Sequence, residues 1–170
     1  MRLLIIFFLF FYFSMFSHAY IVEKETSAIG NGNIKIIFFA DSGHFDIIDN
    51  TTGDVITDNA FFQAGGLRST DPHEKIRVII TDIQNEFGKG KSLMARVHFD
   101  NYADIHWKAV LYDQKDFIEF SVGIINDTDQ PYILKQYFPM LSPNTYPEKD
   151  TDNSFMLLDG NSGGNNTQVR

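Results

Sequence analysis

The sequence of 170 residues contains no cysteine and few basic side chains. Without cysteine it can form no disulfide scaffold, no cysteine-ligated zinc or iron–sulfur site and no cysteine nucleophile. Its 14 lysine and arginine residues stand against 22 acidic residues, which gives a formal net charge of -8. Proteins that bind the phosphate backbone need a positive surface, so this balance argues against a nucleic-acid partner. The hydrophobic share of 44% excludes a disordered chain and predicts a folded domain.

Long apolar runs are also scarce, and the single one lies at the start of the chain. Residues 3–16 are almost wholly apolar, follow Arg2, and precede Ser-His-Ala at 17–19, where small residues suit a cleavage site. This order is typical of a secretory signal peptide. A run of about 14 residues is too short to span a bilayer, which needs roughly 20. We predict a signal peptide at 1–19 and a secreted, periplasmic or extracellular domain at 20–170 that has no membrane contact after cleavage. An uncleaved signal anchor is the alternative.

The rest of the chain has the pattern of strands. Short apolar runs and alternations are separated by turn residues, as at 41–43 and 50–54. In the segments 92–99 and 104–112 alternate residues are apolar, which predicts strands with one buried face. No stretch shows an unbroken helical period. The predicted fold is all-β, a single antiparallel β-sandwich. Further strands are expected at residues 33–40, 44–49, 55–57, 75–83, 117–125, 132–140 and 155–158.

Two histidines on neighbouring predicted strands, His98 and His106, could share one face and begin a metal site. No third ligand is identifiable, so we predict no metal and no cofactor. The acidic turn at 127–129 lacks the glycine and the distal glutamate of an EF-hand calcium loop. Trp107 could be a platform on which a sugar stacks, but its place among alternating apolar residues predicts a core position.

The sequence offers no catalytic constellation. It has no G-x-S-x-G nucleophile motif. A glycosidase needs two carboxylates at a fixed separation, and most aspartates here occupy predicted turns, where Asp favours the bend. We therefore predict no catalytic residue. The Gly- and Asn-rich run at 159–166 lacks the lysine and the helix of a phosphate-binding loop. It is either a ligand loop, in which Asp159 and Asn161 bond sugar hydroxyls, or an ordinary surface loop.

The order of several motifs is that of a known family. A Gly-x-Phe-Asp-Ile-x-Asp-x-x-x-Gly stretch at 43–53 precedes a tryptophan-containing strand at 105–112. A strand at 116–126 that closes in Asn follows, and then Leu-Leu-Asp-Gly-Asn-Ser-Gly-Gly at 157–164. In this order they resemble the amino-terminal β-supersandwich domain (galactose-mutarotase-like) of melibiase-type glycoside hydrolases, the alpha-galactosidase-like enzymes. The resemblance covers nearly all of residues 20–170.

The resemblance implies a non-catalytic role. In those enzymes the supersandwich precedes a (β/α)₈ barrel that holds both catalytic aspartates, and this sequence stops at Arg170 before a barrel could begin. No catalytic residue can therefore be transferred to a position here. We expect the chain to be the N-terminal portion of such an enzyme, with Asp159 and Asn161 bordering the sugar. Its partner would be a carbohydrate or a missing catalytic barrel domain, and exposure of the surface that meets the barrel predicts weak self-association.

Two other functions stay open on the sequence. A stand-alone secreted carbohydrate-binding or adhesion sandwich would use the face around Trp107, His98 and His106. A structural secreted protein would bind no small ligand. Three N-glycosylation sequons are relevant only in a eukaryotic source, and they start at Asn50, Asn126 and Asn165.

Overall fold

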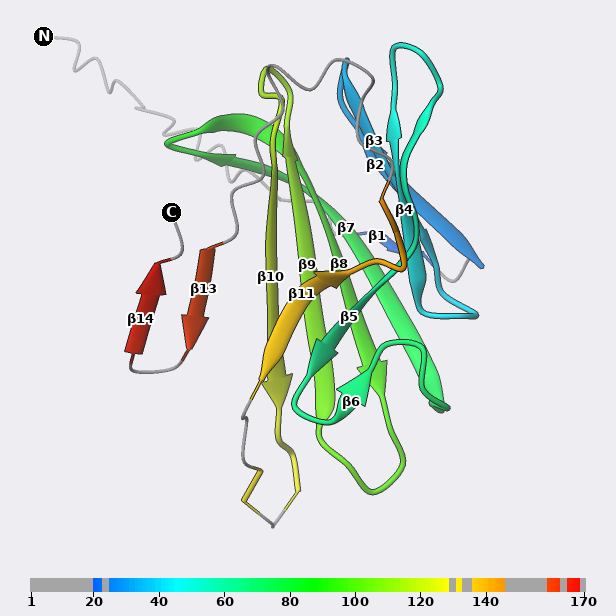
Figure 1. Cartoon of the computed structure of the whole chain (residues 1–170), viewed down its shortest axis with the longest axis vertical. Coiled ribbons are helices and arrows are strands. Elements are labelled where there is room, and N and C mark those ends of the chain that lie inside the picture. Colours follow the sequence, from blue (N-terminus) through cyan, green and yellow to red (C-terminus); the bar gives the residue numbers. More distant parts are fainter. Residues whose placement is uncertain are drawn as a thin grey trace, which may run out of the picture.

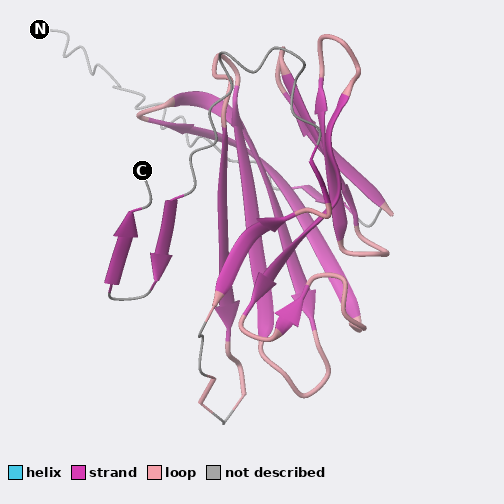
Figure 2. Cartoon of the chain, viewed as in Figure 1, coloured by secondary structure: helices cyan, strands magenta, loops and turns pink. Residues whose placement is uncertain are grey.

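A computed structural model of the chain describes residues 20–22, 25–128, 131–132, 136–145, 159–162 and 165–168. In this part of the chain two antiparallel sheets face each other, and no helix is present (Figure 1, Figure 2). The predicted all-β antiparallel sandwich is therefore confirmed. Nothing in the described segments forms a helix long and apolar enough to cross a membrane.

The first sheet has five strands in the order β1-β7-β8-β9-β10. From β7 to β10 each strand pairs with the next one in sequence, so this part is a meander of hairpins. β1 comes from the start of the described chain and pairs with the free edge of β7. The bounds are β1 Tyr20–Val22, β7 Lys75–Asn85, β8 Gly88–His98, β9 Asp104–Tyr112 and β10 Ile118–Ile125.

The second sheet has the strand order β11-β5-β4-β3-β2, and two short strands, β6 and β12, also pair with β5. β13 and β14 pair as a third, two-stranded sheet, so the Gly- and Asn-rich run that the sequence predicts as a loop contributes residues to two paired strands. The bounds are β2 Thr26–Gly30, β3 Ile34–Phe39, β4 His44–Asp49, β5 Val55–Ala64, β6 Leu67–Arg68, β11 Tyr137–Leu141, β12 Asn144–Thr145, β13 Asp159–Ser162 and β14 Asn165–Gln168.

Trp107 lies in the core between the two sheets, as the sequence predicts. Its side chain is fully buried, and its indole N–H donates a hydrogen bond of 2.8 Å to the carbonyl of Pro139. The ring therefore joins β9 of the first sheet to β11 of the second. Four phenylalanine rings surround it, with centroids 4.8 to 5.7 Å away: Phe45, Phe62, Phe38 and Phe120.

The observed strands differ from the predicted ones where the register is irregular. β5 runs to Ala64, well beyond the predicted 55–57, because bulges opposite β4 interrupt its alternation. Asn59 takes a positive φ of 50° there, and its N–H bonds the Asp46 carboxylate. β2 was not predicted, and β11 begins at Tyr137 rather than 132. The strand predicted at 155–158 lies outside the described residues.

The turn before β4 depends on a glycine. Gly43 has a φ of +72°, a conformation that L side chains rarely adopt. A Cβ at this position would lie 1.9 Å from the carbonyl oxygen of Ser69. The buried Ser69 hydroxyl donates to the Gly43 carbonyl at 2.7 Å and accepts from the N–H of Phe62 at 3.2 Å. The turn and the β6 region are thus held against each other.

Candidate ligand-binding face

We call the face of the five-stranded sheet that points away from the second sheet the outer face. It carries a group of basic side chains, which we call the basic row. The register places Arg77 of β7 opposite Arg96 of β8, and Arg96 opposite His106 of β9. Two residues farther along these strands, Lys75 lies opposite His98. On β8 and β9 the neighbouring odd-numbered residues are buried in the core, so the two-residue period turns this row outward.

A buried carboxylate holds part of this row in place. Asp104, 4% exposed at the start of β9, accepts a hydrogen bond of 2.5 Å from Arg96 Nε and one of 2.7 Å from His98 Nδ1. Arg96 Nη2 donates in addition to Asp127 at 2.8 Å. The hydrogen bond that Arg96 donates to Asp104 is the main cause that raises the pKa of Arg96 above its usual value. His98 Nε2 lies 3.3 Å from the carboxylate of Glu74.

The basic row borders a hollow of about 320 Å³, lined by Lys75, Arg77, Arg96, His98 and Asp104. Within the described part of the chain, the side chains of Lys75 and Arg77 form no hydrogen bond or ion pair. Three permanent cations thus line the hollow beside the carboxylate of Asp104, while Asp127 and Glu74 contact Arg96 and His98 at its border. Among the lining residues, Lys75 and Arg77 are the cations without a carboxylate partner in the described part of the chain.

The pKa of His106 reports the same local charge. It is lowered from 6.5, first by burial of the imidazole and then by the nearby positive charges of Lys108 and Arg96. Both effects disfavour the protonated ring. His106 is therefore a neutral hydrogen-bonding group at neutral pH.

Aromatic side chains cluster at the other end of the outer face. The β7–β8 hairpin brings Phe87 against Tyr112, at 5.6 Å between centroids, and against Phe117, at 6.2 Å. Phe87 and Phe117 are 49% and 44% exposed, whereas Tyr112 is buried. Beneath them Asn85 donates to the Tyr112 hydroxyl at 2.9 Å, and this hydroxyl donates to Glu119 at 2.8 Å. We call Phe87, Phe117 and Tyr112 the aromatic cluster.

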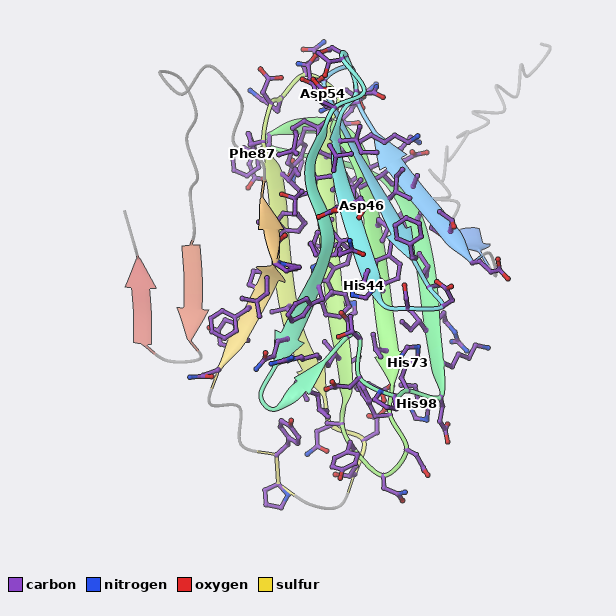
Figure 3. All side chains as sticks on the ribbon, turned by 45° about the vertical axis from the view of Figure 1, so that its right-hand side comes forward. His44, Asp46, Asp54, His73, Phe87 and His98 are labelled. Atoms are coloured by element: carbon purple, nitrogen blue, oxygen red, sulfur yellow. The ribbon has the colours of Figure 1, made fainter. Side chains whose placement is uncertain are left out.

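The hollow and the aromatic cluster lie at opposite ends of one sheet. Phe87 and His98 mark the two ends in Figure 3. Asp104 and Tyr112 are the first and last residues of β9, a span of about 27 Å at the usual rise of roughly 3.3–3.4 Å per residue. A single extended ligand along the outer face could contact both.

The structure places some of the predicted site residues on this face and not others. His98 and His106 share the outer face, as predicted, whereas Trp107 points into the core. Asp159 and Asn161 lie in β13 opposite Gln168 and Asn166, but their side chains are outside the described part of the structure, so their carbohydrate-binding role stays a prediction. No group of three metal-ligating side chains is present among the described residues.

The sequence does not predict Arg77, Arg96 or Asp104 as site residues. It correctly places Asp104 at the start of the strand 104–112, but it gives no sign that this carboxylate is buried. The β7–β8 connection was also not recognised as a tight hairpin, although Asn85 pairs with Gly88 and Gly88 has a positive φ of 122°. Counting outward from that turn would have placed the two arginines opposite each other.

No family model, curated protein or solved structure matches the chain.

Proposed function

We propose that this chain is the non-catalytic, carbohydrate-binding N-terminal sandwich of a secreted glycoside hydrolase of the alpha-galactosidase-like type. The motif order resembles that of such domains, and an antiparallel sandwich is the fold that the resemblance implies. The observation that carries carbohydrate binding is the aromatic cluster. Exposed aromatic faces next to hydrogen-bonding groups suit a sugar, whose ring has apolar C–H faces and polar hydroxyls.

The chemistry of the described residues supports binding rather than hydrolysis. Glycosidic hydrolysis needs an acid and a second carboxylate across the scissile bond. The hollow is lined by a single carboxylate, Asp104, which is already engaged by Arg96 and His98. At the aromatic cluster, Glu119 is the carboxylate that bonds the Tyr112 hydroxyl. In this proposal catalysis belongs to a barrel domain.

A stand-alone secreted carbohydrate-binding or adhesion protein is the second candidate. It would bind through the aromatic cluster, in which Phe87 and Phe117 are 49% and 44% exposed. The two candidates share the binding step and differ in whether a barrel completes the protein.

Binding can be tested by affinity electrophoresis of the full chain through gels that contain galactomannan. We expect retardation, and we expect the double change Phe87→Ala with Phe117→Ala to weaken the affinity by roughly tenfold, because it removes both exposed rings of the aromatic cluster. Phe138→Ala is the matched control, because Phe138 is 38% exposed but lies on β11 of the other sheet.

The same samples test the non-catalytic role on nitrophenyl α-galactoside, where we expect no turnover. Equal retardation of the double variant and the wild type would refute the role of the aromatic cluster. Turnover that is lost in Asp104→Asn would refute the non-catalytic role. Far-UV circular dichroism of each variant verifies that it is folded.

A further inference from the structure

The basic row brings two arginines together on the outer face. Arg77 and Arg96 lie directly opposite each other on neighbouring strands, where side chains are separated by about 5 Å at Cβ. Arg96 is paired with Asp104 and Asp127. Among the described residues Arg77 has no hydrogen-bond or ion-pair partner. Within that part of the chain its guanidinium group is available to a ligand.

Several N–H groups of the two arginines are available as hydrogen-bond donors to a ligand. Arg96 is held by Asp104 and Asp127 through Nε and Nη2, which leaves three of its five N–H donors for a ligand. Its side chain is 40% exposed, so these donors can reach solvent. Arg77 is exposed on the neighbouring strand. Two guanidinium groups side by side match the geometry of a carboxylate or sulfate, which accepts paired hydrogen bonds.

The row also has space above it. Gly123 of β10 lies opposite His106, and a Cβ built on Gly123 would meet no atom within 4 Å. The neighbouring strand therefore places no side chain beside the imidazole. His106, whose ring is kept neutral, can donate one hydrogen bond to a ligand and accept another.

We infer that the hollow is an oxyanion site that binds the carboxylate or sulfate group of an acidic saccharide through Arg77 and Arg96. The oxyanion chemistry stands on the hollow itself, and its assignment to a saccharide rests on the proposed function. His106 borders the bound group and hydrogen-bonds a neighbouring hydroxyl. The aromatic cluster, at the other end of the sheet, takes uncharged sugar rings.

The test is calorimetric titration of the full chain with glucuronate, glucose and sodium sulfate at matched ionic strength, because salt screens such contacts. We expect glucuronate and sulfate to bind and glucose not to. Arg77→Gln should weaken the binding of both anions at least fivefold and leave the melting temperature nearly unchanged, since Arg77 is exposed. Arg77→Lys keeps the charge but loses the paired N–H donors, so its affinity for the anions should lie between those of Arg77→Gln and wild type. Lys35→Gln, on β3 of the other sheet, removes the same charge and should change nothing.

A second readout is the titration of His106 by proton NMR, with the resonance assigned from His106→Gln. A bound anion should raise the pKa of His106, because it offsets the positive charges of Lys108 and Arg96 that lower it. Asp104 and His98 are the other titratable groups around this end of the row, and Gly123 and Ser121 face it from β10. A resonance of His106 that does not respond to saturating glucuronate would contradict the inference.

The outcomes separate this inference from the proposed function. Glucuronate that binds wild type and Arg77→Gln equally overturns the oxyanion site, even if galactomannan binding persists. A second outcome is that sulfate and glucuronate bind in an Arg77-dependent way, while polygalacturonate and galactomannan both fail to bind. This outcome overturns the saccharide assignment and the proposed function, and it leaves the oxyanion site standing. Arg77-dependent retention of polygalacturonate supports both.

Discussion

Replacing Trp107 by alanine should remove a large fraction of the stability of this domain. The side chain is fully buried, and large-to-small aromatic changes in cores cost about 3–5 kcal/mol. Four phenylalanine rings from β3, β4, β5 and β10 would lose their common neighbour. Domains of this size have about 5–15 kcal/mol in total, so the loss amounts to at least about a fifth of the free energy of unfolding.

The hydrogen bond to Pro139 allows the packing and polar contributions to be separated. Trp107→Phe keeps most of the aromatic surface but leaves the Pro139 carbonyl without its 2.8 Å donor. Pro139 is half-buried, so the loss of its donor should cost about 1 kcal/mol, the lower end of the range for an unsatisfied acceptor. We therefore expect Trp107→Phe to destabilise less than Trp107→Ala. Tyr102→Ala is the control, because Tyr102 is 59% exposed and such surface changes usually stay within about 0.5 kcal/mol.

Urea unfolding followed by far-UV circular dichroism measures these differences without relying on the single tryptophan. A loss below about 1 kcal/mol in Trp107→Ala would refute the reasoning, since it falls outside the range for a packed core. The wild-type protein offers an independent measurement. Its tryptophan emission should be that of an indole shielded from water, and an emission typical of exposed indole would contradict the placement of Trp107.

Three further predictions follow from single positions. Gly43→Ala should lower the free energy of unfolding more than Gly53→Ala. Both glycines have a positive φ, which costs an alanine roughly 1–2 kcal/mol, but only at Gly43 would the new Cβ collide with the Ser69 carbonyl. Equal urea midpoints of the two variants would contradict this prediction. Because the pKa of His106 is lowered in the folded protein, the unfolded chain binds the proton more tightly. The free energy of unfolding should therefore fall as the pH drops below about 6.5. His106→Gln should reduce that loss when urea midpoints are compared at about pH 8 and about pH 5. Intact-mass analysis of exported protein should find Tyr20 at the amino terminus, and a soluble product that retains Met1 would argue against the signal peptide.

The sequence predicts the meander from β7 to β10, apart from the first residues of β8, because burial imposes the period of these strands, whereas β1 is not predicted. In 92–98 and 104–112 one face must be apolar, and the observed alternation follows it. The same alternation places His98 and His106 together on the outer face. β5 was underestimated because its bulges opposite β4 break the period, and a bulge leaves no reliable mark in an isolated sequence.

The basic hollow was harder to predict because it depends on register and burial together. Alternation tells which face Arg77 and Arg96 occupy, but only the tight connection at 85–88 fixes them opposite each other. The burial of Asp104 is a tertiary property, since aspartate is rarely buried unless it is paired. Its two basic partners, Arg96 and His98, lie on the adjacent strand rather than near it in sequence.

The paths of β1 and β11 bear on how the sandwich folds. The meander from β7 to β10, like that from β2 to β5, closes through neighbouring hairpins, whose loop-closure entropy is small. β1 must instead reach across to pair Tyr20 with Ile80, and β11 must return to pair Tyr137 with Ala64. Each of these two strands leaves its sequence neighbours and joins the opposite sheet, so together they interlock the layers. Non-local closures of this kind are slow, and we expect the interlock to set the folding rate of a domain whose two halves assemble quickly.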